Sequence, residues 1–117
     1  MRSSLGSGRN HLAPDIPVTE LPVVSVISVA AIRRPTICAA PGMHAGNAHT
    51  GQSRFKHAAD RLLTKEKIRL VLRIAAREKH ELLVLGALGC GAFRNPPADF
   101  AMRWSEVLDE EEFKGGW

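Results

Sequence analysis

Apolar residues are concentrated in three stretches of the chain. Residues 21–31 are nearly all small and apolar and rich in valine, which is typical of a β-strand covered on both faces, as in a parallel sheet. Between residues 55 and 79, apolar side chains recur at helical spacing, and this predicts a long amphipathic helix. Residues 82–87 form a second apolar run of strand length. Strand, helix and strand in this order predict a βαβ unit with parallel strands and a right-handed connection.

The other segments are polar or irregular. Residues 1–20 are polar without a sustained period and predict a disordered tail. Residues 35–53 contain prolines, glycines and isolated polar residues, which favours an irregular crossover. A last helix is expected over residues 97–110, ending near a glycine pair. The whole pattern predicts one α/β domain in this chain of 117 residues.

The segment between the second predicted strand and the last predicted helix carries the clearest chemical signal. Residues 86–91 contain three glycines, and Asn95 follows with a pair of prolines after it. Asparagine is a favoured helix N-cap, and proline suits the first turn because N–H groups there have no partner within the helix. A strand, a glycine loop and a helix start collect free N–H groups at the positive end of a helix dipole. The pattern predicts a phosphate-bearing small molecule at the end of the sheet; the alternative is a tight turn without a ligand.

Other glycine motifs do not fit this spacing. No lysine follows Gly91 at the position that a Walker loop requires, and the glycines do not match the Rossmann fingerprint Gly-x-Gly-x-x-Gly. A nucleophile elbow around Cys90 would need glycines where the chain has Leu88 and Ala92. We expect Cys90 to be a small packed side chain, because nothing nearby would activate its thiol.

Residues 85–97, Leu-Gly-Ala-Leu-Gly-Cys-Gly-Ala-Phe-Arg-Asn-Pro-Pro, resemble the diphosphate-binding loop of microbial-type poly(ADP-ribose) glycohydrolases, a branch of the macrodomain superfamily. Residues 23–31 resemble the strand ahead of that site and residues 67–76 a long helix of the family. Residues 104–117 resemble the helix and exit that follow the loop. The resemblance implies a partial macrodomain-like fold of three layers, αβα, with parallel strands and flanking helices. Residues 21–117 would be the C-terminal half of such a domain, lacking its N-terminal half.

The catalytic segment of this family has no counterpart in the chain. Family enzymes hydrolyse the ribose–ribose O-glycosidic bond of poly(ADP-ribose) with the glutamates of a Gln-Glu-Glu signature. Here the one glutamine is Gln52, which Ser53 follows, and the adjacent glutamates 110–112 lie in an acidic run near the C-terminus. The resemblance therefore implies a portion that binds ADP-ribose or poly(ADP-ribose) without catalytic residues, and we expect no cofactor.

The resemblance assigns ligand contacts to the loop. Backbone groups of Gly89, Gly91 and Ala92 would hold the diphosphate. Phe93 would pack against the distal ribose, or else cover the last helix. Many family members carry glycine in place of Arg94, which either supplements a phosphate contact or is an exposed loop arginine. The full set of expected ligand contacts is Gly89, Cys90, Gly91, Ala92, Phe93, Arg94 and Asn95.

Several other residues are weaker candidates for a binding site. We expect Asn95 to cap the last helix rather than to bind a ligand. Ser28 and Ala30 are candidates for pocket lining, because open α/β sheets bind ligands beyond the carboxyl ends of their strands. His44 and His49 do not form a metal site by this spacing, since neither cysteine nor carboxylate accompanies them in that loop.

Charge and composition leave other classes open. A net charge of +4 favours polyanionic ligands, and the basic residues of the long helix make a nucleic-acid-binding protein a weaker alternative. A non-enzymatic remnant or interaction protein without any ligand is another alternative. Two cysteines without a disulfide framework favour the reducing cytoplasm or nucleus, with a mitochondrial presequence as a minor alternative. No apolar stretch approaches the length of a membrane span.

The predicted sheet is small for its apolar content. Two strands alone do not form a stable sheet, and at least three are normally needed. The valines of residues 23–31 would stay exposed without further partners. We therefore predict that the isolated chain is marginally folded, aggregation-prone, or dependent on a missing half-domain or a partner chain.

Overall fold

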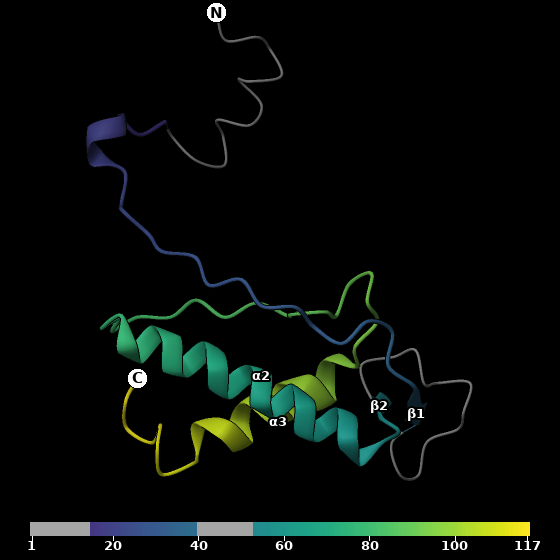
Figure 1. Cartoon of the computed structure of the whole chain (residues 1–117). Helices are drawn as coiled ribbons and strands as arrows, with labels where there is room; N and C mark the ends of the chain where they lie inside the picture. The colour runs from purple at the N-terminus through teal and green to yellow at the C-terminus, as the bar shows by residue number, and fades with distance from the viewer. Residues whose placement is uncertain (1–14, 40–52) are drawn as a thin grey trace, which may run out of the picture.

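Two helices packed against each other form the centre of the structure, a computed structural model that describes residues 15–39 and 53–117. Helix α2 spans Ala58–Arg77 and helix α3 spans Pro97–Leu108. Figure 1 shows both helices with a small β-sheet at one end. Both predicted helices are confirmed, each somewhat shorter than expected. None of the helices in the described ranges is long and apolar enough to cross a membrane.

One face of each helix supplies the core. Ile68, Leu72 and Ala75 of α2 are buried, with the three- and four-residue spacing that the sequence predicts. Val107 of α3 and Phe113 beyond it complete a buried cluster with Ile68 and Leu72. This cluster holds α2 and the C-terminal part of the chain together.

Ion pairs join α2 to α3 and to the acidic run after it. Arg69 donates to both carboxylate oxygens of Glu110, at 2.8 and 2.7 Å. Arg73 binds Glu112 in the same two-pronged way, at 2.7 and 2.8 Å. Lys65 lies 3.2 Å from Glu106. Several basic residues of α2, which the sequence suggests as contacts for polyanions, are thus already paired with carboxylates of the same chain.

The described sheet has two short antiparallel strands. Strand β1 spans Ile37–Ala39, strand β2 spans Ser53–Phe55, and Cys38 pairs with Arg54 at the centre of the register. The prediction of an irregular crossover was therefore wrong at both ends of that segment. Strands of this length carry too few residues to show a period, which explains why the sequence did not reveal them.

Helix α3 is tied to β2 through a buried carboxylate. Asp99, in the first turn of α3, accepts a hydrogen bond of 2.8 Å from the backbone N–H of Phe55. Its other carboxylate oxygen lies 3.1 Å from Arg103, one turn further along α3. The side chain of Phe55 is fully buried. These contacts fix the start of α3, and therefore the end of the loop before it.

The segments predicted as parallel strands are extended but unpaired. Residues 22–32 and 80–87 belong to no helix or strand. The prediction of strands at 21–31 and 82–87 is therefore wrong for this structure, since neither segment has a neighbour with which to exchange main-chain hydrogen bonds within the described residues. In Figure 1 both segments run in the same direction, opposite to α2. The mixed α/β class is confirmed, whereas the described sheet is antiparallel.

Both extended segments expose apolar side chains. Leu83 packs against the core cluster, whereas Leu82 is 90% exposed and Val84 is fully exposed. In the first segment Ile27 is partly buried and Val26 is 82% exposed. Residues 26–31 alternate between exposed and partly buried, with the period of a β-strand. In residues 81–87 only Leu83 is partly buried.

The beginning of the described chain adds one short element. A 3₁₀ turn, η1, spans Val18–Glu20 within the predicted tail, and all its side chains are exposed. Residues 1–14 of that tail lie outside the described residues. So do His44 and His49, the two histidines considered as metal ligands, and Gln52.

Candidate functional site

Residues 87–95 form a tight loop between the second extended segment and α3. Gly89 has a φ of 74°, and Arg94 has a φ of 56°, so both lie in the left-handed region. Three main-chain hydrogen bonds close the loop, from the N–H of Cys90 to Ala87 O (3.0 Å), of Arg94 to Gly91 O (2.9 Å) and of Asn95 to Gly89 O (2.9 Å). The glycine-rich turn that the sequence predicts is therefore present.

Two of the glycines have different surroundings. A Cβ atom at Gly89 would lie 2.4 Å from the Cβ of Ala31 and 2.6 Å from the Nδ2 of Asn95. A side chain there would also strain the backbone, because φ is positive. A Cβ at Gly91 would meet nothing within 4 Å. Gly89 thus permits the close approach of two segments, whereas Gly91 leaves open space above the loop.

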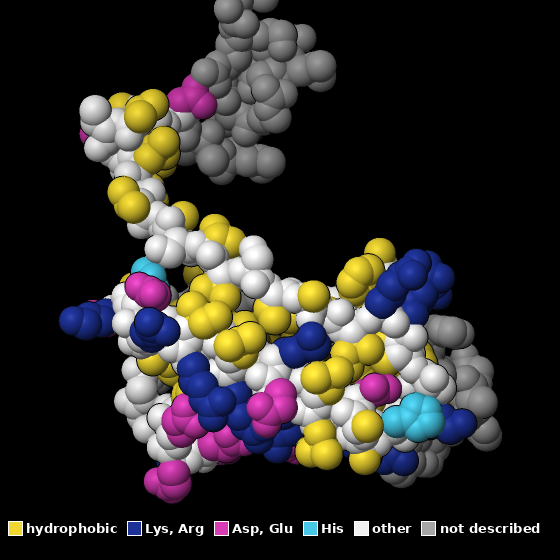
Figure 2. Space-filling model, viewed as in Figure 1, with side chains coloured by type: hydrophobic (Ala, Val, Ile, Leu, Met, Phe, Trp, Pro, Cys, Tyr) yellow, Lys and Arg dark blue, Asp and Glu magenta, His cyan; other side chains and the backbone are white. Residues whose placement is uncertain are grey.

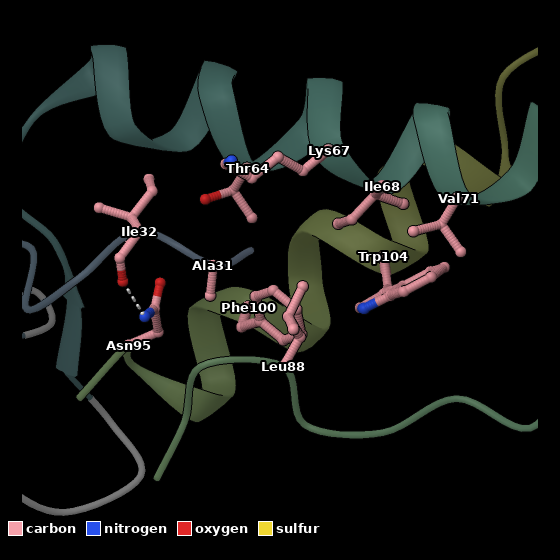
Figure 3. Close-up of a pocket in the computed structure, with 10 residues that line it drawn as sticks. All are labelled: Ala31, Ile32, Thr64, Lys67, Ile68, Val71, Leu88, Asn95, Phe100 and Trp104. Carbon is pink, nitrogen blue, oxygen red and sulfur yellow. Dashed lines mark hydrogen bonds between the residues drawn. The ribbon is translucent and has the colours of Figure 1, made fainter. Parts of the chain in front are cut away.

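Asn95 joins the ends of the two extended segments. Its side chain is buried, and Nδ2 donates to the carbonyl of Ile32 at 2.7 Å, drawn as a dashed line in Figure 3, and to that of Gly89 at 3.1 Å. The N-cap of α3 is Pro96, with no side-chain cap, and the helix begins at Pro97. The prediction that Asn95 caps the helix was therefore wrong, because its amide bonds these two carbonyls instead.

Three consecutive residues of the loop present free donors. Gly91, Ala92 and Phe93 are exposed, and their N–H groups take no part in the hydrogen bonds within residues 15–39 and 53–117. Phe93 is 38% exposed, so part of its side chain is open to solvent. Successive peptide N–H groups of such a loop are donors to which phosphate oxygens can bind.

Basic side chains lie near these donors. The Phe93 carbonyl accepts a hydrogen bond of 2.8 Å from the N–H of Arg34, which brings the end of the first segment to the loop. The side chains of Arg33, Arg34 and Arg94 are exposed. In Figure 2 basic side chains gather at the end of the molecule where this loop lies in Figure 1. The local charge therefore favours an anion.

Cys90 is a packed thiol rather than a reactive one. It is partly buried, and its Sγ lies 3.8 Å from the carbonyl oxygen of Leu88. Burial raises the pKa of the Cys90 thiol above its ordinary value, which lowers the thiolate fraction at neutral pH. This agrees with the small packed side chain that the sequence predicts.

The cavity beneath the loop is too small for a ligand. Its volume is about 10 Å³, enough for at most one water molecule. Figure 3 shows apolar side chains from α2, α3 and the first segment closing it, and the buried Nε1 of Trp104 has no partner in the described residues. Ser28 and Ala30, the predicted lining residues, are exposed and do not line it. Its lining residues are Ala31, Ile32, Thr64, Lys67, Ile68, Val71, Leu88, Asn95, Phe100 and Trp104.

A larger, open cavity lies at the other end of α2. Its volume is about 560 Å³, within the range of small-molecule sites. The Nε1 of Trp117 donates to the His80 carbonyl at 3.1 Å, and the rings of Trp117 and Phe113 are stacked. Sequence reasoning missed this cavity because its walls come from residues 73–81 and 112–117, which share no motif. It is the rival location for a ligand.

The glutamates after α3 are poorly suited to donate protons. The hydrogen bonds from Arg69 lower the pKa of Glu110 below its ordinary value, and those from Arg73 lower the pKa of Glu112. Both carboxylates are therefore ionised at neutral pH, whereas a general acid must hold a proton there. Their role in this structure is to pair with α2.

No protein-family model, curated protein or solved structure matches this chain. The likeness to glycohydrolases therefore depends on the residues of the chain itself.

Proposed function

We propose that residues 89–95 bind the diphosphate of ADP-ribose, as the binding portion of a domain similar to microbial-type poly(ADP-ribose) glycohydrolases. The observation that carries the proposal is the row of free, exposed N–H groups at Gly91, Ala92 and Phe93. Together they offer donors to two phosphate groups. Open space at Gly91 lets a ligand approach the backbone directly.

The surroundings of the loop suit the rest of such a ligand. Arg94 and Arg34 are exposed beside the donors and would offset the charge of the diphosphate. The half-exposed ring of Phe93 offers a flat apolar surface to a ribose. The ligand would bind on the surface, since the cavity below the loop holds at most one water.

We propose binding without hydrolysis. The chain has no Gln-Glu-Glu segment, and Glu110 and Glu112 are engaged in ion pairs. The two extended segments would become neighbouring parallel strands of a three-layer αβα fold when the rest of the sheet is present. Their common direction supports this, as does the alternation of exposed and partly buried residues over 26–31. The free thiols of Cys38 and Cys90 suit the reducing cytoplasm or nucleus.

Nucleic-acid binding has less support. That alternative depends on the basic residues of α2, but Arg69 and Arg73 each bind a carboxylate through two nitrogens. Lys65 also has a carboxylate partner. An extended anionic strand would have to compete with these contacts along the helix.

Calorimetric titration of the full chain with ADP-ribose tests the proposal. We expect Gly91→Val to lower the affinity by about tenfold or more, because the new side chain covers the donors. Both Gly91 and Gly86 have nothing within 4 Å of an added Cβ. Gly86→Val is therefore the matched control, and it should bind like the wild type.

Circular dichroism of each sample shows whether the variants stay folded. Absence of heat from folded wild-type protein would reject the proposal. Equal loss of affinity in both glycine variants would also count against it, because Gly86 lies outside the row of donors.

A further inference from the structure

The first extended segment exposes both its apolar side chains and its main chain. Val23 is fully exposed, Val24 is 74% exposed and Val26 is 82% exposed. Within the described part of the chain, neither the N–H groups of residues 23–31 nor the C=O groups of residues 22–31 form a hydrogen bond. An uncharged, extended segment with unpaired main-chain groups is the kind of edge to which another strand adds.

We propose that a second copy of this chain pairs with the segment. Residues 22–31 of the two copies would run antiparallel about a twofold axis perpendicular to the new sheet, so that each copy contributes the same surface. Val24 and Val26 of both copies would then lie side by side on one face, and Val23 would lie on the other. No charged residue lies between Leu21 and Ile32, so the centre of this pairing brings no like charges together.

The charges at the two ends of the segment select this partner and this direction. Glu20 precedes the segment, and Arg33 and Arg34 follow it; all three are exposed. Antiparallel pairing of two copies places Glu20 of each beside the arginines of the other. Parallel pairing would place like charges together. The segment is therefore complementary to itself in one orientation.

The pairing shares the side chain of Arg34, but no main-chain donor, with the proposed binding of ADP-ribose. It uses main-chain groups of residues 22–31 and none of the free N–H groups at residues 91–93. A dimer that fails to bind ADP-ribose, or a monomer that binds it, is therefore physically possible. The two proposals can fail independently.

Sedimentation of the full chain over a range of concentrations tests the pairing. We expect a reversible monomer–dimer equilibrium. Val26→Lys should weaken it about tenfold or more, because two lysines would meet near the axis without a counter-charge. Leu62→Lys, at an α2 position that is 62% exposed, is the control and should dimerise like the wild type. Since both side chains are exposed in one copy, neither change should unfold it, and circular dichroism checks this.

A charge exchange gives a second, independent test. Glu20→Arg should weaken the dimer by about threefold to tenfold, because it faces the arginines of the other copy. Adding Arg33→Glu and Arg34→Glu to the same chain should restore the wild-type equilibrium. A chain that stays monomeric at every concentration overturns the proposal. So does a dimer that tolerates Val26→Lys, because another surface or another pairing would then hold it.

Discussion

Gly89 and Gly91 stand two positions apart in one loop and have different functions. Gly89 adopts a positive φ and lies against Ala31 and Asn95, so it allows the ends of the two extended segments to meet. Gly91 faces open space beside the free N–H groups. The glycine pattern predicted a tight turn with an accessible backbone, and the structure divides these two properties between the two residues.

Replacing Gly89 should destabilise the fold. Gly89→Ala places a methyl group within 2.4 Å of the Ala31 Cβ and forces alanine into the left-handed region. We expect a loss of about 2–3 kcal/mol in the free energy of unfolding. The control, Gly86→Ala, should change it by less than about 0.5 kcal/mol. Urea unfolding measures both, and equal stability of the two variants would show that the close approach at Gly89 does not exist.

The role of Asn95 could not be predicted from its neighbours in sequence. A local pattern of asparagine before two prolines indicates a helix cap. The amide instead reaches the carbonyl of Ile32, 63 positions earlier in the chain. Local rules identify a residue with a strong tendency to bond backbone groups, but only the fold decides which groups those are.

At the scale of elements, the helices were predictable and the strands were not. The apolar period of α2 is a property of the helix itself, and it survives in the buried Ile68, Leu72 and Ala75. A strand exists only when a neighbour exchanges main-chain hydrogen bonds with it. Residues 22–32 and 80–87 have the apolar composition of strands but no such neighbours within the described residues. Within the described residues they are therefore extended but form no sheet.

The ion pairs between α2 and the acidic run should make the stability of the fold depend on pH in the acidic range. Arg69 lowers the pKa of Glu110 from its ordinary value of 4.5. This stabilisation is complete above the pKa of the unfolded chain and is lost as pH falls through the lower pKa of the folded state. We expect the pair to contribute about 1 kcal/mol. Stability should therefore decline as pH drops below about 4.5.

Two variants separate this effect from general acid unfolding. Glu110→Gln should flatten the decline in thermal midpoint, because the residue no longer titrates. Glu112→Gln should flatten it less, since its partner Arg73 and Glu112 are each about half exposed, at 51% and 47%, and water screens the pair. If the two variants behave alike, burial does not set the strength of these pairs.

At the scale of the whole molecule, the apolar surface is larger than the helices can cover. Val23, Val26, Leu82 and Val84 are each more than four-fifths exposed. Burial of such side chains stabilises a fold by about 1.5–3 kcal/mol each, against a typical total of about 5–15 kcal/mol for a domain. The sequence-based prediction of a marginally stable or partner-dependent chain is consistent with this exposure and stays a prediction until the stability is measured.

Two surfaces of the molecule are candidates for the ligand-binding site. The loop offers donors without a deep cavity, whereas the open cavity near Trp117 offers a volume of about 560 Å³ with a charged rim. Lys79 on that rim offers a positive charge to an anion as well. A titration that reports only total heat does not distinguish the two locations.

Amide chemical shifts of the full chain during titration with ADP-ribose make that distinction directly. We expect the N–H resonances of Gly91, Ala92 and Phe93 to shift with a common saturation curve, while those of residues 73–81 and 112–117 stay in place. Shifts confined to the cavity near Trp117, or no shifts in a folded sample, would contradict the central claim that these three peptide groups bind a diphosphate.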